Sequence, residues 1–147
     1  METHLMDRKA EARWSGDLKS GKGTVHLGSR AFEGPYSFMS RFESGSGTNP
    51  EELLGAAHAG CYSMALAHAL AMGGHPATSV KTTATVHLNK QDAGFAITGI
   101  DLVTHGVVPG VSAEEFQRFA EETKTNCIVS KALSAVPMTL KATLASG

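Results

Sequence analysis

One stretch of the sequence decides the fold: residues 47–74, which read GTNPEELLGAAHAGCYSMALAHALAMGG. It predicts a long helix, because Asn49 can cap the start, Pro50 fits the first helical position, and Glu52 falls where a capping box places a carboxylate. The glycine pair at its end, with a proline two residues beyond, predicts where the helix stops. The helix would hold roughly two dozen residues and measure about 36 Å.

The composition of this helix indicates how it is packed. Alanine and other small apolar residues occupy all sides of it, which is typical of a buried helix or of a membrane span. The membrane interpretation is weak, since His58 and His68 interrupt the run and alanine takes the place of leucine and phenylalanine. We expect a central core helix that one small domain cannot cover alone, which favours an intimate homodimer.

Hydrophobic alternation and turn residues predict the other elements. Before the long helix we expect strands over residues 9–14, 24–27 and 36–42. After it we expect a hairpin of strands over 79–88 and 95–108, a helix capped by Ser112 that runs towards Lys124, a short helix after Cys127, and a strand over 137–144. No βαβ unit repeats, so the order indicates an α+β fold in a single domain over residues 1–147.

Charge narrows the possible partners. The chain carries 13 basic and 14 acidic residues and no basic cluster, so it lacks the positive surface that nucleic acids or anionic lipids require. A small molecule or a second copy of the chain is the expected partner. The segment Met1–Arg8 contains acidic residues and no apolar run, so it is not a secretory signal, and we expect a cytoplasmic protein.

Cys61 and Cys127 are the only cysteines. In a reducing compartment such a pair is more often catalytic, redox-sensing or metal-binding than structural, although two inert thiols remain an alternative. His58 and His68 fall near the helix face that carries Cys61. Their spacing is not that of a chelating pair and no Cys-x-x-Cys accompanies them, so we predict no metal and expect His58 to be a packed polar group with a hydrogen-bond partner.

Electrostatics leaves open which thiol attacks. Cys61 is about ten residues into the helix, roughly 15 Å from its positive end, so its thiolate needs a separate cation. Arg41 suits this role because it cannot lose its proton. Glu51 and Glu52 could hold its guanidinium, although both could equally serve the helix start. Cys127 begins a short helix whose N–H groups would favour its own thiolate, so it could also be the attacking thiol.

Three motifs carry a family resemblance: Arg41-Phe42-Glu43, residues 47–61, and Cys127-Ile128-Val129-Ser130. Together they resemble the OsmC branch of the OsmC/Ohr hydroperoxide reductases, and the similarity covers nearly the whole chain. The resemblance implies an OsmC-like fold, in which two long central helices of an interlocked homodimer are backed by six-stranded, mostly antiparallel sheets. It also implies two active sites at the subunit interface.

The resemblance assigns roles as well. It implies that Cys61 is the peroxidatic thiol, Cys127 the resolving thiol, Arg41 the residue that stabilises the thiolate, and Glu51 the residue that orients Arg41. Organic hydroperoxides, and hydrogen peroxide more weakly, would be reduced through a Cys61 sulfenic acid and a Cys61–Cys127 disulfide. An external dithiol, by family precedent of lipoyl type and carried for example by a lipoylated protein, would reopen the disulfide. No metal or other cofactor is implied.

Two positions depart from the family pattern. Ile128 stands where proline commonly follows the second cysteine, and we expect this to loosen the presentation of Cys127 and to slow resolution. Gly60 stands where alanine is usual. The main alternative from another functional class is a dithiol redox sensor or binding protein, whose disulfide changes its shape for a partner without catalytic turnover.

Overall fold

The computed structural model describes residues 6–146. Most of the segment Met1–Arg8, on which the expectation of no secretory signal rests, lies outside the described residues. Contacts group the chain into two compact units, residues 1–50 and 51–147, so the single domain stays a prediction. No helix in the described part is both long enough and apolar enough to cross a membrane.

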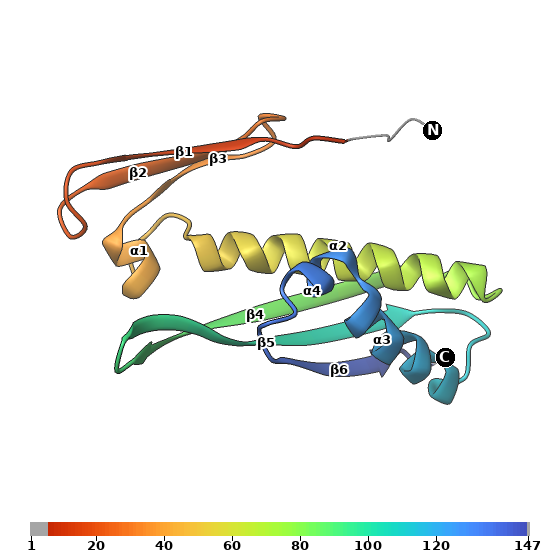
Figure 1. Cartoon of the computed structure of the whole chain (residues 1–147). Coiled ribbons are helices and arrows are strands. Elements are labelled where there is room, and N and C mark those ends of the chain that lie inside the picture. The colour runs from red at the N-terminus through yellow and green to blue at the C-terminus, as the bar shows by residue number, and fades with distance from the viewer. Residues whose placement is uncertain (1–5, 147) are drawn as a thin grey trace, which may run out of the picture. The chain divides into compact units, whose positions relative to one another are not determined.

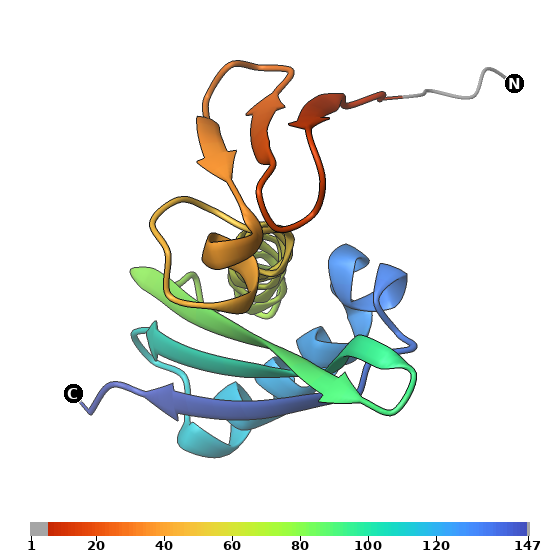
Figure 2. The ribbon, with the colours of Figure 1, turned by 90° about the vertical axis from the view of Figure 1, so that its left-hand side faces the viewer.

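The first unit is a small antiparallel sheet followed by one short helix. Its elements are β1 (Ala10–Ser15), β2 (Lys22–Leu27), β3 (Glu33–Tyr36) and α1 (Phe38–Phe42). The strands pair in the order β1–β2–β3, and Figure 2 shows them side by side. Trp14, Gly23 and Tyr36 are aligned across the three strands, and the two rings are 5.3 Å apart. Glycine is required between them, because a Cβ atom there would collide with both rings.

The strand expected over residues 36–42 is wrong, because β3 ends at the first of these residues and α1 follows. The cause is a reciprocal capping box: the Ser37 hydroxyl accepts from the Ser40 N–H at 3.1 Å, and the Ser40 hydroxyl accepts from the Ser37 N–H at 2.8 Å. The phenylalanines at the two ends of α1 stack one turn apart, with ring centroids 5.1 Å apart. Arg41 therefore lies on a helix and not at the end of a strand.

The second unit contains most of the secondary structure. Its elements are α2 (Pro50–Met72), β4 (Ser79–Gln91), β5 (Gly94–Val107), α3 (Ala113–Asn126), α4 (Ile128–Ala132) and β6 (Met138–Leu144). β4 and β5 form the expected hairpin, and β6 pairs with β5 in parallel (Figure 1). The parallel pairing requires a crossover, which α3 and α4 provide. The predicted α+β class and the order of elements after α2 are confirmed.

The predicted ends of the two main helices are confirmed by their caps. At the end of α2, Gly74 adopts a φ of 88°, and its N–H and that of the next residue donate to carbonyl groups of the last helical turn at 3.0 and 2.8 Å. At the start of α3, the Ser112 hydroxyl accepts from the Glu115 N–H at 3.1 Å. The side-chain amide of Asn49 donates to the Ser40 carbonyl at 3.0 Å, so its capping of α2 stays a prediction.

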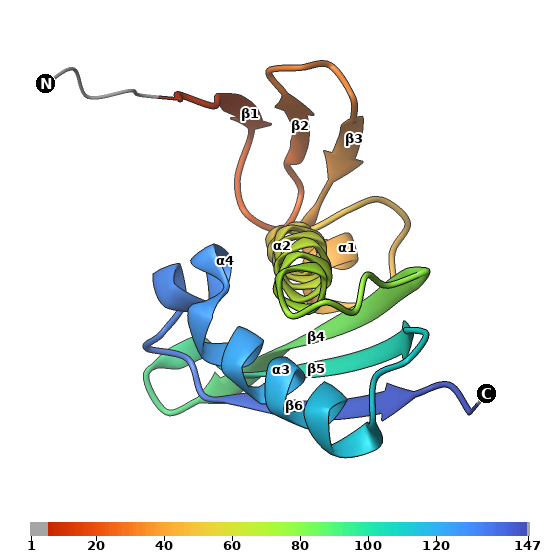
Figure 3. The ribbon, with the colours of Figure 1, turned by 90° about the vertical axis from the view of Figure 1, so that its right-hand side faces the viewer.

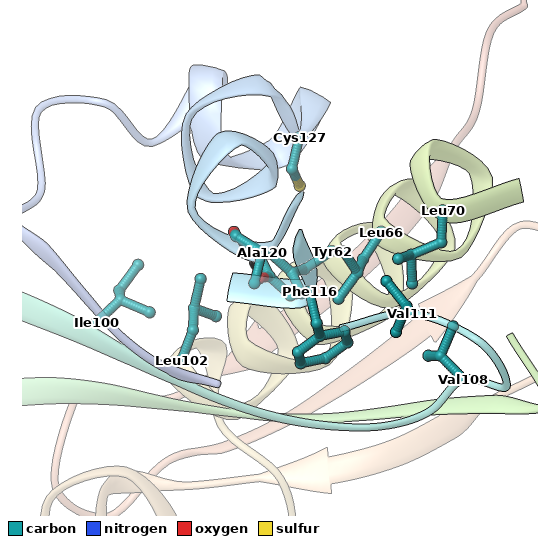
Figure 4. Packing of buried hydrophobic residues seen from close by; sticks show 10 residues of the cluster. All are labelled: Tyr62, Leu66, Leu70, Ile100, Leu102, Val108, Val111, Phe116, Ala120 and Cys127. Carbon is teal, nitrogen blue, oxygen red and sulfur yellow. Dashed lines mark hydrogen bonds between the residues drawn. The ribbon is translucent and has the colours of Figure 1, made fainter. Parts of the chain in front are cut away.

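The core of the second unit lies between α2, α3 and one face of the sheet (Figures 3 and 4). Its largest members are Tyr62, Leu66 and Leu70 from α2, Ile100 and Leu102 from β5, and Phe116 from α3. Another side of α2 carries Met64 and Met72, which are 75% and 76% exposed, so one chain does not bury the helix all round. This matches the expectation that the chain cannot cover α2 alone; the homodimer and its six-stranded sheets stay predictions.

Candidate active site

The second unit brings the two cysteines together. Cys61 lies on α2 and Cys127 lies immediately before α4, and the two side chains are near enough for each to affect the ionisation of the other. The crossover makes this possible, because the Tyr62 hydroxyl donates to the Ala120 carbonyl at 2.8 Å and fixes α3 to α2 beside the thiols. Cys61 is partly exposed, whereas Cys127 is only 1% exposed and lies at the edge of the core (Figure 4).

The first turn of α4 presents N–H groups to both sulfur atoms. The backbone N–H groups of Ile128 and Val129 act on the Cys61 sulfur, and those of Val129 and Ser130 act on the Cys127 sulfur. The Cys127 side chain makes no cap hydrogen bond with this turn, so the amides act on its sulfur mainly through electrostatics. The hydroxyl of Ser130 adds a side-chain donor to the Cys127 sulfur.

The pKa values of the two thiols are shifted in opposite directions. Burial opposes ionisation of Cys127, but the backbone N–H of Ser130, the Cys61 thiol and the Ser130 hydroxyl outweigh it and lower the pKa of Cys127. Burial raises the pKa of Cys61, the thiolate of Cys127 raises it further, and the amides of Val129 and Ile128 only partly offset the rise. In the second unit Cys127 is therefore the thiol that ionises more readily.

The groups around Cys61 in the second unit therefore do not lower its pKa enough to favour a thiolate. Arg41, the cation expected to do so, lies exposed on α1 in the first unit, with its guanidinium 5.2 Å from the Phe42 ring centroid. It lines a cavity of about 210 Å³ with aromatic side chains of β1, β3 and α1. Glu51 is buried in the first turn of α2 and Glu52 is exposed. The roles assigned to Arg41 and Glu51 stay predictions.

His58 is the packed polar group that the sequence indicated. It is fully buried, and its Nε2 atom lies 2.7 Å from the Ser130 hydroxyl oxygen, which confirms a hydrogen-bond partner. Burial lowers the pKa of His58 and so favours the neutral ring. His68 is exposed. Nowhere in residues 6–146 do three His, Cys, Asp or Glu side chains gather as a possible metal site, and the absence of a metal stays a prediction.

Ser130 is the residue of this site to which sequence reasoning gave no role. It is 4% exposed and interacts with both His58 and Cys127. Its position three residues after Cys127, in the first turn of a helix, was a usable signal, because a side chain there faces back towards the residue that begins the helix. Its contact with His58 could not be read from the sequence, since 72 positions separate the two residues.

Comparisons with known proteins agree with this architecture. Residues 43–141 match the family model described as OsmC-like protein. The chain is 50% identical over 129 residues to Peroxiredoxin OsmC of Escherichia coli (strain K12) and to that of Shigella flexneri, which covers 87% of this chain and 90% of each relative.

Two solved structures share the fold. The organic hydroperoxide resistance protein OhrB of Bacillus subtilis has a TM-score of 0.73 at 24% identity and covers 97% of this chain and 100% of its own. An OsmC-like protein from Mycoplasma pneumoniae has a TM-score of 0.71 at 17% identity and covers 96% of this chain and 100% of its own. The predicted OsmC-like α+β fold is thus confirmed, and the chain belongs to the OsmC family.

Proposed function

We propose that this protein is a thiol-dependent peroxidase that reduces organic hydroperoxides, and hydrogen peroxide more weakly, in the cytoplasm. Its likeness to two relatives named as peroxiredoxins, at 50% identity over most of the chain, makes it an enzyme of the peroxidase type. The observation that carries the finer proposal is that Cys61 and Cys127 lie near enough for each to affect the ionisation of the other. Such proximity lets one thiol react with peroxide and the other close a disulfide with it.

In the first step the Cys61 thiolate attacks one peroxide oxygen. An S–O bond forms, the O–O bond breaks, and the departing alkoxide takes a proton and leaves as an alcohol, so that Cys61 becomes a sulfenic acid. Exposure favours Cys61 for this step, because it is partly exposed while Cys127 is buried. The raised pKa of Cys61 means that the step needs a cation, and we assign this role to Arg41, oriented by Glu51.

In the second step Cys127 resolves the sulfenic acid. Its thiolate attacks the Cys61 sulfur, the S–S bond forms, the S–O bond breaks, and the hydroxide that leaves takes a proton to become water. The lowered pKa of Cys127 suits it to this role, since the resolving nucleophile must also be a thiolate. An external dithiol, for which we propose a lipoyl-type compound or a lipoylated protein, then reduces the disulfide. We propose that the enzyme works as a homodimer and needs no bound cofactor or metal.

Steady-state consumption of cumene hydroperoxide with dihydrolipoamide tests the assignment. Cys61→Ser should abolish turnover, and Cys127→Ser should react once and then stall, because no disulfide can form. Ser63→Ala is the matched control: it removes an α2 hydroxyl that bonds the Thr82 hydroxyl at 2.7 Å, and it should retain activity. Sustained turnover by Cys61→Ser would refute the proposal.

The reductant and the role of the cation need separate tests. Arg41→Ala should raise the pKa of Cys61, measured from the pH dependence of its alkylation, while Arg41→Lys should restore part of the effect by keeping the charge. An unchanged profile in Arg41→Ala would remove Arg41 from the mechanism. A single stoichiometric oxidation of the wild-type protein, with no turnover by any dithiol in a reductant panel, would indicate a redox sensor instead.

A further inference from the structure

The buried ring of His58 takes part in none of the steps above. It is fully buried on α2, its Nε2 atom lies 2.7 Å from the Ser130 hydroxyl oxygen, and its Nδ1 atom is the one buried side-chain nitrogen or oxygen in the described part of the chain without a hydrogen-bond partner. Buried polar groups are costly unless they are paired. A histidine at this position, one helical turn before Cys61, costs stability, and we therefore expect it to have a functional role.

Because the Nδ1 atom of His58 has no hydrogen-bond partner, the direction of the hydrogen bond between His58 and Ser130 can be inferred. A neutral imidazole carries one proton, and burial keeps this ring neutral. Placing the proton on Nδ1 would leave a buried N–H group without an acceptor, which is the rarer and costlier arrangement. The proton therefore sits on Nε2 and is donated to the Ser130 oxygen. The Ser130 hydroxyl then has its own hydrogen available for the Cys127 sulfur, which lies at the start of the same helical turn and whose ionisation this hydroxyl favours.

We propose that His58 and Ser130 form a buried relay in which His58 sets the direction of the Ser130 hydroxyl and so holds the Cys127 sulfur as a ready nucleophile for resolution. Both are positioning residues for the second step, and the inference rests on the proposed function and deepens it. Ser130 contacts the reacting sulfur, whereas His58 acts through Ser130. The relay leaves the first step, at Cys61, to other groups.

The surroundings of Cys127 explain why it needs such a donor. Two titratable groups of α2 interact with the Cys127 sulfur. The Cys61 thiol favours its ionisation, and the Tyr62 phenol has a pKa that is raised by burial, then by Glu121 and by the charge of Cys127. Once Cys61 is oxidised to the sulfenic acid, its thiol no longer exists as a donor. The backbone of the first turn of α4 and the Ser130 hydroxyl then remain to stabilise the attacking thiolate.

The first experiment measures Cys127 alone, without any peroxide. In a Cys61→Ala background, the ultraviolet absorbance of the thiolate is titrated for the parent, Ser130→Ala, His58→Leu and His58→Gln. Ser130→Ala and His58→Leu should raise the pKa of Cys127, whereas His58→Gln should preserve it because its amide can still donate to the Ser130 oxygen. An unchanged Cys127 pKa in both Ser130→Ala and His58→Leu would overturn the relay.

The second experiment follows a single turnover in the protein with both cysteines. Ser130→Ala and His58→Leu should form the sulfenic acid at least as fast as the wild type, because a less ionised Cys127 opposes the ionisation of Cys61 less. They should close the disulfide on the order of tenfold more slowly, the loss expected for one hydrogen bond to a charged atom. His68→Leu, a matched histidine substitution at an exposed position of α2, should leave both rates unchanged. Equal disulfide rates in wild type, Ser130→Ala and His58→Leu would refute the inference.

The two experiments separate failure of the relay from failure of the proposed function. If wild type forms no sulfenic acid with any hydroperoxide, the peroxidase assignment fails, while the titration of Cys127 still decides whether His58 and Ser130 act on its thiolate. If His58→Leu does not fold, Ser130→Ala carries the test, because it removes a single oxygen atom from the first turn of α4. A normal Cys127 pKa in Ser130→Ala would then overturn the inference.

Discussion

Two glycines on α2 allow the packing around Cys61 to be tested by making the same substitution at two positions. Gly60 precedes Cys61, and among the described residues nothing lies within 4 Å of the position where its Cβ atom would be. Gly55, about a turn and a half earlier, is buried, and its Cβ atom would lie 3.3 Å from the Ala84 carbonyl oxygen on β4. The same change to alanine should therefore have different effects at the two sites.

The expected magnitudes follow from these distances. Alanine in a helix interior is more stable than glycine by about 0.8–1.0 kcal/mol, so Gly60→Ala should raise the free energy of unfolding by about that amount. Gly55→Ala has the same helix gain, but overpacking against a strand backbone costs about 1–3 kcal/mol, so its net effect should lie between about zero and a 2 kcal/mol loss. The two variants should thus differ by about 1–3 kcal/mol.

Urea unfolding at one fixed protein concentration measures both values, since oligomerisation would make apparent stability depend on concentration. For a chain of this size, the stabilisation of Gly60→Ala corresponds to a rise in Tm of about 2–4 °C. A loss of stability in Gly60→Ala would refute the reasoning, because it would mean that some group outside this chain already occupies the space beside Gly60. A loss that deepens with protein concentration would identify that group as a second copy.

Two further predictions concern a backbone donor and a surface carboxylate. Ile128→Pro should raise the pKa of Cys61, seen as slower alkylation near neutral pH, because it removes an N–H that acts on this sulfur, and Ile128→Ala should leave the pKa unchanged. Hydrogen bonds from Thr139 and His87 lower the pKa of Asp101 below its ordinary value of 3.8. The ionised carboxylate therefore stabilises the fold fully above pH 3.8, and this stabilisation is lost as the pH falls through the lower pKa of the folded state. The destabilisation caused by Asp101→Asn should therefore be present at pH 7 and fade below pH 3.8, and an equal loss at both would contradict this.

The structure adds a second expectation for Ile128. That the loss of proline loosens the presentation of Cys127 stays a prediction; α4 begins at residue 128, and Cys127 has a φ of −55° and a ψ of 133°. That ψ lies in the range that a residue before proline prefers, so the backbone of Cys127 is compatible with a following proline. What isoleucine adds is an N–H group directed at the Cys61 sulfur, which proline lacks.

The sequence predicted those elements whose signals are local. The ends of α2 and α3 were predictable because a glycine with positive φ and a serine cap act within a few residues. The strand expected over residues 36–42 failed because its alternation also fits a helix, in which Phe38 and Phe42 meet one turn apart. The serine pair that caps this helix uses serine in place of the usual glutamate, so the capping box went unrecognised.

The residue types of the site could be predicted from the sequence, but the contacts between residues far apart in the chain could not. The two thiols stood out because they are the only cysteines and one of them lies in a specific motif. The contact of Ser130 with His58 depends on how α3 and α4 return to α2, which no local pattern encodes. The same holds for the amides of the first turn of α4, which favour ionisation of both sulfur atoms, and for the mutual effect of the two thiols, which raises the pKa of Cys61 and lowers that of Cys127.

The long stretch of chain between the two thiols links the proposed chemistry to the lifetime of the protein. Cys61 and Cys127 are separated by about 66 residues, and a disulfide across a loop of that length would restrict the unfolded chain by about 4 kcal/mol on the chain-entropy model. On the proposed mechanism the oxidised enzyme is then harder to unfold than the reduced enzyme. Proteases that act on unfolded chains would remove the reduced form first, and a protein awaiting its reductant would persist in the cell.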